Sequence, residues 1–318
     1  MSEPSKLLLD IPVEHSGWRL DRSLATLLPE YSRARLQGWI AKQLVSVDGS
    51  TYSQRHIVNG GESVVILPVE ENLNQENKAE KIALDIVHED EHLLGLNKPA
   101  GLVVHPGAGN RTGTLLNALL YHDHQLSSLP RGGIVHRLDK NTSGLIVVAK
   151  SLIAHTALVE KMQKREIQRH YYAVIRGQMI SGGTIDQPIG RHPNDRVKMA
   201  VSAKGKPAVT RYKILEKFSS HTWVEAQLET GRTHQIRVHF AALSHPLVGD
   251  NVYGQRVQRV ANVSSEFNDF LANFPRQALH AHQLALQHPV TGQKLRWNAP
   301  LPGDMERLLK MLRQHSKE

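Results

Sequence analysis

The sequence predicts an α+β fold in two domains, and three observations support this prediction. The chain has 318 residues, which is more than a single hydrophobic core usually serves. Residues 68–81 are polar, contain no aromatic side chain and cannot bury much surface, so we expect a flexible linker there. Beyond this linker, strand-like and helix-like segments interleave without the regular βαβ repeats of a doubly wound sheet.

Residues 17–67 are expected to form a small α/β domain. The helical spacing of leucines predicts a helix over residues 19–30, where Asp21 stands near the start and suits the helix dipole. The same spacing predicts a second helix over residues 32–43. The stretch "LVSVDGSTYSQ" alternates around an Asp-Gly pair, which is a strong signal for a hairpin turn, and "GESVVILP" closes the domain as a strand.

Residues 82–318 are expected to form the larger domain. The stretch "HLLGLNKPAGLVVHP" predicts a strand, a turn at Pro-Ala-Gly and a second strand. Ser151 is expected to cap a helix that has Ile153, Leu158 and Met162 on one side. Further strands are predicted over residues 144–150, 169–177, 208–218 and 222–230, and further helices over residues 231–243 and 304–314.

The composition favours a polyanionic partner and a cytoplasmic protein. The net charge is +9, and basic surfaces attract phosphate backbones and release their counterions, although a merely solvated basic surface has the same composition. The absence of cysteine excludes disulfides and thiolate sites and fits a reducing cytosol. No apolar run approaches the length of a membrane span, so we expect no membrane partner.

Asp139 is the first candidate for chemistry. It lies in "GGIVHRLDKNTSGLIVVAK", between two apolar runs and flanked by Arg137 and Lys140. Aspartate is common in turns, so a purely structural role is one interpretation. The other is a nucleophile or general base, which must be ionised and which a nearby arginine would hold in that state. Arg232 and Arg237 in "GRTHQIR" are candidate partners, and their spacing alone does not decide between them.

Tyr171 and Tyr172 in "RHYYAV" are the second candidate pair. Neighbouring side chains on a strand point to opposite faces, so one tyrosine can lie in the core while the other faces a cleft. Two packed tyrosines would have the same sequence. In an enzyme acting on nucleic acid, a tyrosine in a cleft can stack on a flipped base or transfer a proton.

We expect neither a metal nor a cofactor. Among the 19 histidines, His280 and His282 have a spacing seen in metal ligands, but there is no HExxH motif and no carboxylate at matching spacing. A phosphate-binding loop with its lysine and a Gly-x-Ser-x-Gly elbow are also absent from the sequence. ATP-dependent and serine-hydrolase reactions are therefore disfavoured.

Taken together, these motifs resemble those of the RluA-type pseudouridine synthases. The stretch around Asp139 is similar to the family signature, and "NKPAGLVVHPG", "RHYYAVIRG", "LETGRTHQIRVH" and "HPLVGDNVYG" match its other motifs in order. The resemblance implies a catalytic domain at residues 82–318, built on a mixed, largely antiparallel sheet flanked by helices. It also implies a cofactor-free isomerisation, in which the bond from C1′ to N1 of a uridine breaks and the base is rejoined through C5.

The resemblance further implies roles for individual residues. Asp139 is at the position of the catalytic aspartate, which either adds to C1′ or removes the C2′ proton. Arg237 matches the arginine paired with it, and Arg232 is the second candidate for that role. Tyr171 matches the tyrosine that stacks under the uracil and serves in removal of the C5 proton. The substrate-binding residues implied are Arg137, which fills the gap left by the flipped nucleotide, Ile236, an apolar neighbour of the site, Arg232 and His136.

Residues 17–67 resemble an S4 RNA-binding module, which some family members carry before the catalytic domain. In such a module Arg33, Arg35, Lys42 and Arg55 are candidates for contacts with RNA phosphates, which position a protein without reading sequence. A solvated helix face is the alternative interpretation for each of them. The linker would raise the effective concentration of the active site near the docked RNA.

The amino-acid sequences of the motifs are most similar to those of family members that act on the helix 69 loop of 23S ribosomal RNA. We therefore expect a monomer whose partner is 23S ribosomal RNA or the large ribosomal subunit. Two alternatives stay open: the same chemistry on tRNA or another ribosomal site, because target choice depends on RNA shape, and a catalytically silent assembly factor. A metal-dependent nuclease is a remote third possibility.

Overall fold

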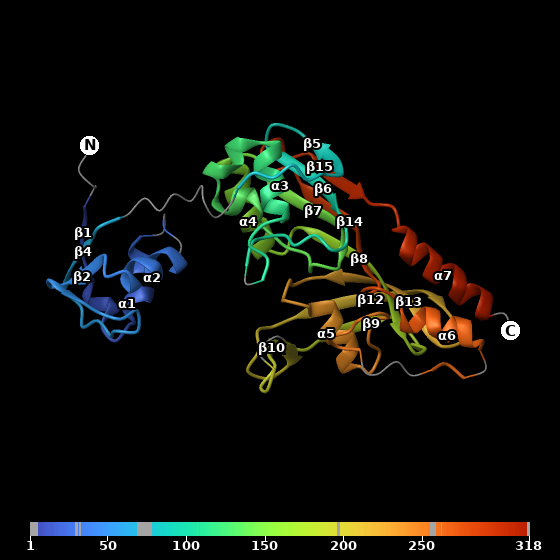
Figure 1. Cartoon of the computed structure of the whole chain (residues 1–318). Coiled ribbons are helices and arrows are strands. Elements are labelled where there is room, and N and C mark those ends of the chain that lie inside the picture. The colour runs from blue at the N-terminus through green and yellow to red at the C-terminus, as the bar shows by residue number, and fades with distance from the viewer. Residues whose placement is uncertain are drawn as a thin grey trace. The chain divides into compact units, whose positions relative to one another are not determined.

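The computed structural model describes residues 6–28, 31, 33–68, 78–107, 109–195, 198–254, 259–261 and 263–316. The chain divides into two compact units, Met1–Glu76 and Asn77–Glu318, which are coloured blue and cyan to red in Figure 1. Most of the predicted linker, residues 69–77, lies outside the described residues. No helix in the described part of the chain is both long and apolar enough to cross a membrane.

The first unit packs two helices on a small antiparallel sheet. Its elements are β1 (Leu7–Asp10), the 3-10 helix η1 (Val13–His15), α1 (Leu20–Leu27), α2 (Arg33–Ala41), β2 (Val45–Val47), β3 (Ser50–Thr51) and β4 (Ser63–Ile66). The predicted hairpin turn is confirmed: Asp48 and Gly49 both have positive φ, as a tight two-residue turn between β2 and β3 requires. Strand β1, which the sequence did not suggest, pairs along its whole length with β4.

The core of the first unit comes from the predicted apolar stripes. Leu20 and Leu24 of α1 and Leu36 and Trp39 of α2 are fully buried against Val64 and its neighbours in the sheet. The helices therefore form where helical spacing presents apolar side chains to one side.

The second unit is built around one large mixed sheet, which confirms the predicted sheet and flanking helices (Figure 1). Its strands are β5 (Ile86–Glu89), β6 (Leu93–Lys98), β7 (Ser143–Ala149), β8 (Gln168–Arg176), β9 (Gly183–Asp186), β10 (Ile189–Arg191), β11 (Met199–Val201), β12 (Val209–Lys217), β13 (His221–Leu228), β14 (Leu279–Gln287) and β15 (Lys294–Asn298). Its helices are α3 (Leu115–His122), η2 (His124–Ser128), η3 (Pro130–Gly133), α4 (Leu152–Gln163), α5 (Gln235–Ala242), α6 (Ser265–Ala272) and α7 (Gly303–His315).

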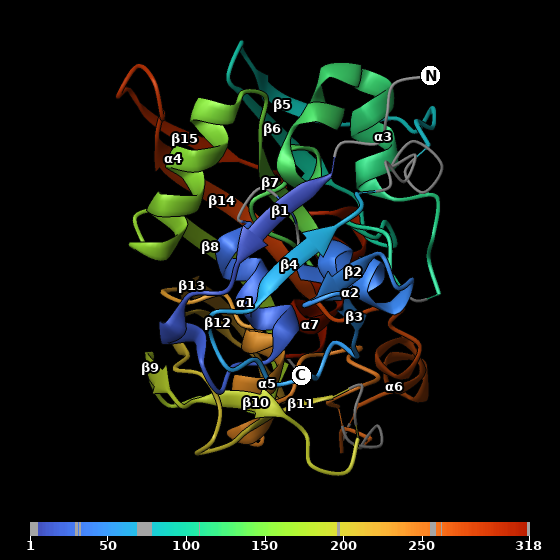
Figure 2. The ribbon, with the colours of Figure 1, turned by 90° about the vertical axis from the view of Figure 1, so that its left-hand side faces the viewer.

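The order of strands in the large sheet is β5-β6-β7-β14-β8-β13-β12-β9, with β15 also paired to β14, and a separate ribbon joins β10 to β11. Among the described pairs of the large sheet, only β7 and β14 run parallel. This parallel pair joins the two halves of the sheet, and Figure 2 shows the same ribbon turned by 90°.

Helices cover both halves of the sheet. In the half containing β6 and β7, α3 packs on one apolar cluster and α4 on another, each through alternate strand residues. In the other half, α5 packs on Tyr171 and Ala173 of β8, while α6 and α7 pack on Val174. The prediction that Tyr171 and Tyr172 point to opposite faces is confirmed, because Tyr172 lies with the α6 and α7 cluster.

One local prediction is wrong and another is wrong in one residue. The second strand expected in "HLLGLNKPAGLVVHP" does not form: after Gly101, which has φ of +90°, Val103 makes only an isolated bridge with Thr114. Helix α4 is capped by Ser151 as predicted, since its hydroxyl accepts the Ala154 N–H, but Ile153 is 69% exposed. Leu158 and Met162 pack against the sheet as predicted, together with Ala154, so the apolar spacing was wrong only for Ile153.

Candidate active site

The parallel pairing of β7 and β14 determines where the site forms. Parallel strands begin at the same edge of a sheet, so the segments that precede them meet there. Gly144 lies opposite Ala281 in this pair, and a Cβ at Gly144 would be 2.3 Å from the Ala281 carbonyl oxygen. The close approach therefore requires glycine, and it brings the loop with Asp139 next to the loop with Arg276.

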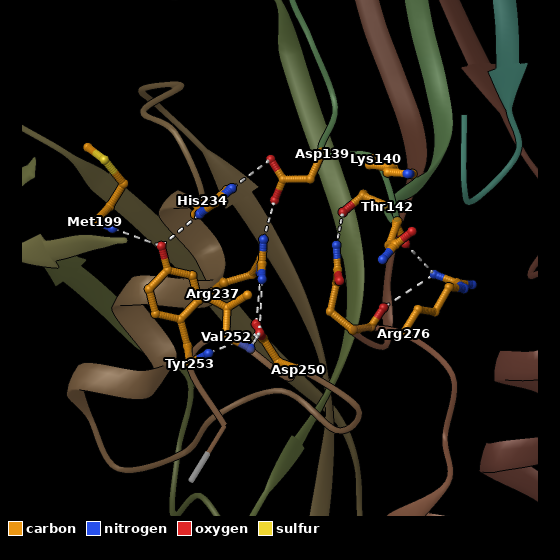
Figure 3. A network of polar contacts seen from close by, with 12 residues as sticks. Asp139, Lys140, Thr142, Met199, His234, Arg237, Asp250, Val252, Tyr253 and Arg276 are labelled. Carbon is orange, nitrogen blue, oxygen red and sulfur yellow. Dashed lines mark hydrogen bonds and ion pairs between the residues drawn. The ribbon is translucent and has the colours of Figure 1, made fainter. Parts of the chain in front are cut away.

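Buried donors hold the loop that carries Asp139 from two sides, and Figure 3 shows the side formed by Arg276. The Lys98 ammonium donates to the carbonyl of Lys140 at 3.1 Å and to two further carbonyls of its own loop. Arg276 donates to the Asn141 carbonyl at 3.3 Å, and Gln277 donates to the Thr142 hydroxyl at 3.1 Å. Burial lowers the pKa of Lys98 to about 7, against the opposing charge of Asp139. The backbone next to Asp139 is thus fixed by side chains from distant parts of the chain.

Arg237 of α5 contacts Asp139 and is itself held by Asp250 (Figure 3). Its Nη1 donates to Asp139 Oδ2 at 3.0 Å, while Nε and Nη2 donate to the two oxygens of Asp250 at 2.7 and 2.9 Å. Burial opposes the charge of Arg237, but the hydrogen bonds and charges of Asp250 and Asp139 raise its pKa above the ordinary value. Asp250 also accepts the N–H groups of Val252 and Tyr253, which orient its carboxylate.

His234 approaches the other oxygen of Asp139. The Tyr253 hydroxyl accepts the Met199 N–H at 3.0 Å and lies 2.7 Å from His234 Nδ1. His234 Nε2 lies 3.8 Å from Asp139 Oδ1, and a ring proton on Nε2, directed at this carboxylate, lets Nδ1 accept the Tyr253 hydroxyl. Burial lowers the pKa of His234, so the ring is neutral at pH 7. The Asp139 side chain keeps 19% exposure, so it is oriented but open to a reacting atom.

Tyr171 and Ile236 lie together beside this network. Both are buried in one apolar cluster with Leu138, the residue before Asp139. Burial raises the pKa of the Tyr171 phenol, the charge of Arg169 opposes that effect and the charge of Asp139 adds to it. The phenol is therefore neutral at pH 7.

His136 forms its hydrogen bond with strand β7 and not with Asp139. Its Nε2 accepts the Val147 N–H at 3.0 Å, so the ring proton is on Nδ1. Burial, with the charge of Arg169 second, lowers the pKa of His136 to about 3. Protonation would also remove the acceptor that Val147 uses, which keeps this imidazole neutral.

The other predicted residues of the second unit do not form an ion pair with Asp139, and the candidate RNA-binding residues lie in the first unit. Arg137 is exposed, two residues away on the same loop. Arg232 donates from Nε to the Pro207 carbonyl at 3.0 Å, so of the two candidate arginines it is Arg237 that forms the ion pair. Arg33 bonds to Asp21 in the first unit, Arg35 lies over the rings of Tyr31 and Trp39, and Lys42 and Arg55 are exposed.

Several site residues were missed by reasoning from sequence. Asp250, His234 and Tyr253 lie in the quoted motifs "HPLVGDNVYG" and "GRTHQIR", so their motif membership was a usable signal. Lys98 also lies in a quoted motif, "NKPAGLVVHPG". Arg276 stands in "FPRQALH" with no such signal, because its role depends on the pairing of β14 with β7.

The predicted histidine spacing does not assemble a metal site in the described part of the chain. No group of three or more histidine, aspartate or glutamate side chains there could hold a metal ion. His280 Nδ1 lies 2.9 Å from the Ser143 hydroxyl, and His282 stacks on Tyr172 and pairs with Glu225.

Known proteins resemble the chain over part or all of its length. Residues 92–242 match the family model described as RNA pseudouridylate synthase. The "Ribosomal large subunit pseudouridine synthase D" of Pseudomonas aeruginosa is 52% identical over 314 residues, covering 99% of this chain and 98% of that protein. The protein of the same name from Escherichia coli strain K12 is 50% identical over 320 residues, covering 100% and 98%.

A solved structure supports the same relationship. The "Human RNA Pseudouridylate Synthase Domain Containing 4" superimposes with a TM-score of 0.57 at 29% identity, covering 72% of this chain and 93% of that one. The ordered motifs, the sheet and the full-length relatives agree. The chain therefore belongs to the RluA-type pseudouridine synthase family, whose members are isomerases.

Proposed function

We propose that the protein converts specific uridines in the helix 69 loop of 23S ribosomal RNA to pseudouridine, without a cofactor. The observation that carries this proposal is the geometry of Asp139, whose carboxylate is open to a substrate while Arg237 and Asp250 fix its orientation. Two of the full-length relatives described above are named for the large ribosomal subunit, which supports ribosomal RNA as the partner.

Asp139 is the group that acts at the ribose. The reaction needs one carboxylate that either adds to C1′ or removes the proton from C2′, so that the bond to N1 breaks and the base can turn. Arg237 places a positive charge 3.0 Å from one oxygen, and His234 leaves the other oxygen free of a short hydrogen bond. Since the loop around Asp139 is anchored by Lys98 and Arg276, little reorganisation is needed as the reaction proceeds.

Tyr171 and Ile236 form the apolar surface against which the uracil ring packs. A neutral phenol is suited to stacking. The Tyr171 ring packs in the same apolar cluster as Leu138, the residue before Asp139. Once C5 has bonded to C1′, its hydrogen must leave, and the family resemblance assigns Tyr171 to its removal. The exposed Arg137 fills the space that the flipped uridine vacates, and His136 lines the substrate side of the same loop.

The first unit is proposed to be an S4-like RNA-binding module. Asp21 is buried at the start of α1 and accepts hydrogen bonds from Arg19, Arg33 and Gln37, which ties the two helices together. This arrangement holds the Arg33 guanidinium, half-exposed, at the start of α2. Phosphate contacts from Arg33 and Arg35 at the start of α2, from Lys42 just after its end and from Arg55 would position the RNA without reading its sequence.

Release of tritium from C5-labelled 23S ribosomal RNA tests the proposal. C5 loses its hydrogen only when carbon replaces nitrogen in the glycosidic bond, so release reports this chemistry directly. We expect release from free RNA or from assembled large subunits, with the product mapped to the helix 69 loop. Release that maps elsewhere, or occurs only with tRNA, would overturn the proposed target, and no release from any RNA would overturn the chemistry.

A further inference from the structure

Arg169 of β8 is a buried cation for which the described residues supply no ion pair. It is 6% exposed, and its Nε has no hydrogen-bond partner in the described part of the chain. A Cβ at Gly231 would lie 2.7 Å from its Nη1, so the guanidinium is confined against bare backbone. Strand alternation places Arg169 on the same face as Tyr171, two residues later, and therefore beside the site.

The neighbours of Arg169 do not supply a negative charge. His136 is neutral, because its Nε2 accepts the Val147 N–H, and Tyr171 is a neutral phenol. The carboxylates of the site, Asp139 and Asp250, are bound to Arg237. The positive charge on Arg169 is therefore not compensated by a direct contact with any of these groups.

A buried guanidinium with unused donors is costly in the free protein, and an anionic ligand would remove that cost. The fork of arginine donors matches the oxygens of a phosphate in geometry and charge. A uracil carbonyl would accept a hydrogen bond but leave the charge unpaired. An RNA phosphate therefore fits better than the base, and a flipped nucleotide brings one on each side of its ribose.

We propose that Arg169 binds an RNA phosphate directly attached to the ribose of the target uridine. This inference rests on the proposed function, because it takes the ribose to lie at Asp139 and the base at Tyr171. Arg169 then differs from Arg237, whose donors are occupied within the protein, and from Arg137, which is exposed. It acts as a substrate-positioning residue that holds the backbone while Asp139 acts on the sugar.

The test uses the full chain and helix 69 RNA fragments in which one phosphate beside the target uridine is replaced by an uncharged methylphosphonate. For one of the two flanking positions, the wild type should lose about 10- to 100-fold in kcat/KM, the range for a hydrogen bond to a charged group. Arg169→Gln should show a similar loss on unmodified RNA and no further loss on the modified RNA. Arg313→Gln, which removes an exposed arginine on α7, should keep the full wild-type sensitivity.

If Arg169 contacts one phosphate, the loss caused by Arg169→Gln and the loss caused by the methylphosphonate do not add. A purely structural role for Arg169 would not produce this result. Equal losses for the wild type and Arg169→Gln on modified RNA would overturn the proposal. If Arg169→Gln fails to fold, the wild type still decides, because insensitivity to both methylphosphonates would exclude a phosphate contact. If no RNA fragment releases tritium, the proposed function is wrong. The affinities of the wild type and Arg169→Gln for the unmodified and modified RNAs then test the phosphate contact independently.

Discussion

Asp250→Asn tests whether the hydrogen bonds from Arg237 to Asp250 contribute to stability and to the orientation of Arg237 toward Asp139. The substitution keeps the shape of the side chain and removes its charge. In the wild type, the Asp250 carboxylate accepts two hydrogen bonds from Arg237 and the N–H groups of Val252 and Tyr253. An amide has one accepting oxygen, and its NH₂ group would face donors in at least one of these directions.

The expected cost follows from the two hydrogen bonds between Asp250 and Arg237. Each hydrogen bond to a charged group contributes about 1.5–3 kcal/mol, and breaking a buried charged pair from one side costs about 3–5 kcal/mol in total, which is the destabilisation expected here. For a unit of this size, that is a fall in Tm of roughly 6–20 °C. Arg237 would also lose its orientation toward Asp139, and a displacement of about 1 Å lowers kcat by about 100-fold.

The pH dependence of stability provides a second signature of Asp250. Burial raises the pKa of this carboxyl, but Arg237 and two backbone N–H groups lower it further, so the net pKa is below the ordinary 3.8. A folded pKa below the unfolded one means that the stabilisation is present above pH 3.8 and is lost as the pH falls below it. The wild type should therefore lose this contribution in acid, and Asp250→Asn should lack it.

Thermal unfolding followed by circular dichroism at pH 7 and pH 3, together with tritium release, measures these effects. Asp269→Asn, at an exposed position on α6, is the matched control and should behave as wild type. The reasoning is refuted if Asp250→Asn unfolds within about 1 kcal/mol of the wild type and turns over at the same rate.

Three further predictions concern other parts of the chain. Replacing Arg33 and Arg35 by glutamine should weaken binding of ribosomal RNA. The slope of log affinity against log salt concentration should become shallower by about one unit per lost phosphate contact, as measured by filter binding at several salt concentrations. Gly144→Ala should destabilise the protein by more than about 3 kcal/mol in urea unfolding, because φ is +113° and the new Cβ would meet the Ala281 carbonyl. Tyr171→Phe removes only the hydroxyl, so RNA affinity should persist while tritium release falls by about 100-fold or more if the phenol transfers the proton.

Each of these predictions has a clear contrary result. An unchanged salt slope would exclude Arg33 and Arg35 from phosphate contact, provided that circular dichroism shows the first unit intact. Wild-type stability of Gly144→Ala would show that β7 and β14 can separate without cost. Full turnover by Tyr171→Phe would leave Tyr171 with the stacking role alone.

Local patterns in the sequence predicted the elements but not the way in which they meet. Helical spacing located α1, α2 and α7, and the Asp48-Gly49 pair located the hairpin, because these features depend on near neighbours in the chain. The missed strand β1 is short, and its pairing with β4 depends on a partner more than 50 residues away. Periodicity also misjudged Ile153 of α4, since its exposure depends on the sheet beneath the helix.

The site could be predicted in part for the same reason. Asp139 and Arg237 were singled out as candidates, and the structure places them 3.0 Å apart, whereas spacing alone could not choose between Arg232 and Arg237. The anchoring by Lys98 and Arg276 could not be foreseen, because it requires the parallel pairing of β7 with β14. The burial of Arg169, whose Nε has no hydrogen-bond partner among the described residues, could not be foreseen either, since a sequence does not show which charged side chains end up without a partner.

The central claim is that the carboxylate of Asp139 carries out the reaction. Tritium release from C5-labelled 23S ribosomal RNA by Asp139→Asn, beside RNA binding by the same variant, tests it most directly. The proposed mechanism predicts no release together with affinity close to that of the wild type, because the substitution removes the reacting charge and leaves the shape of the site. Release at a rate near that of the wild type would contradict the claim.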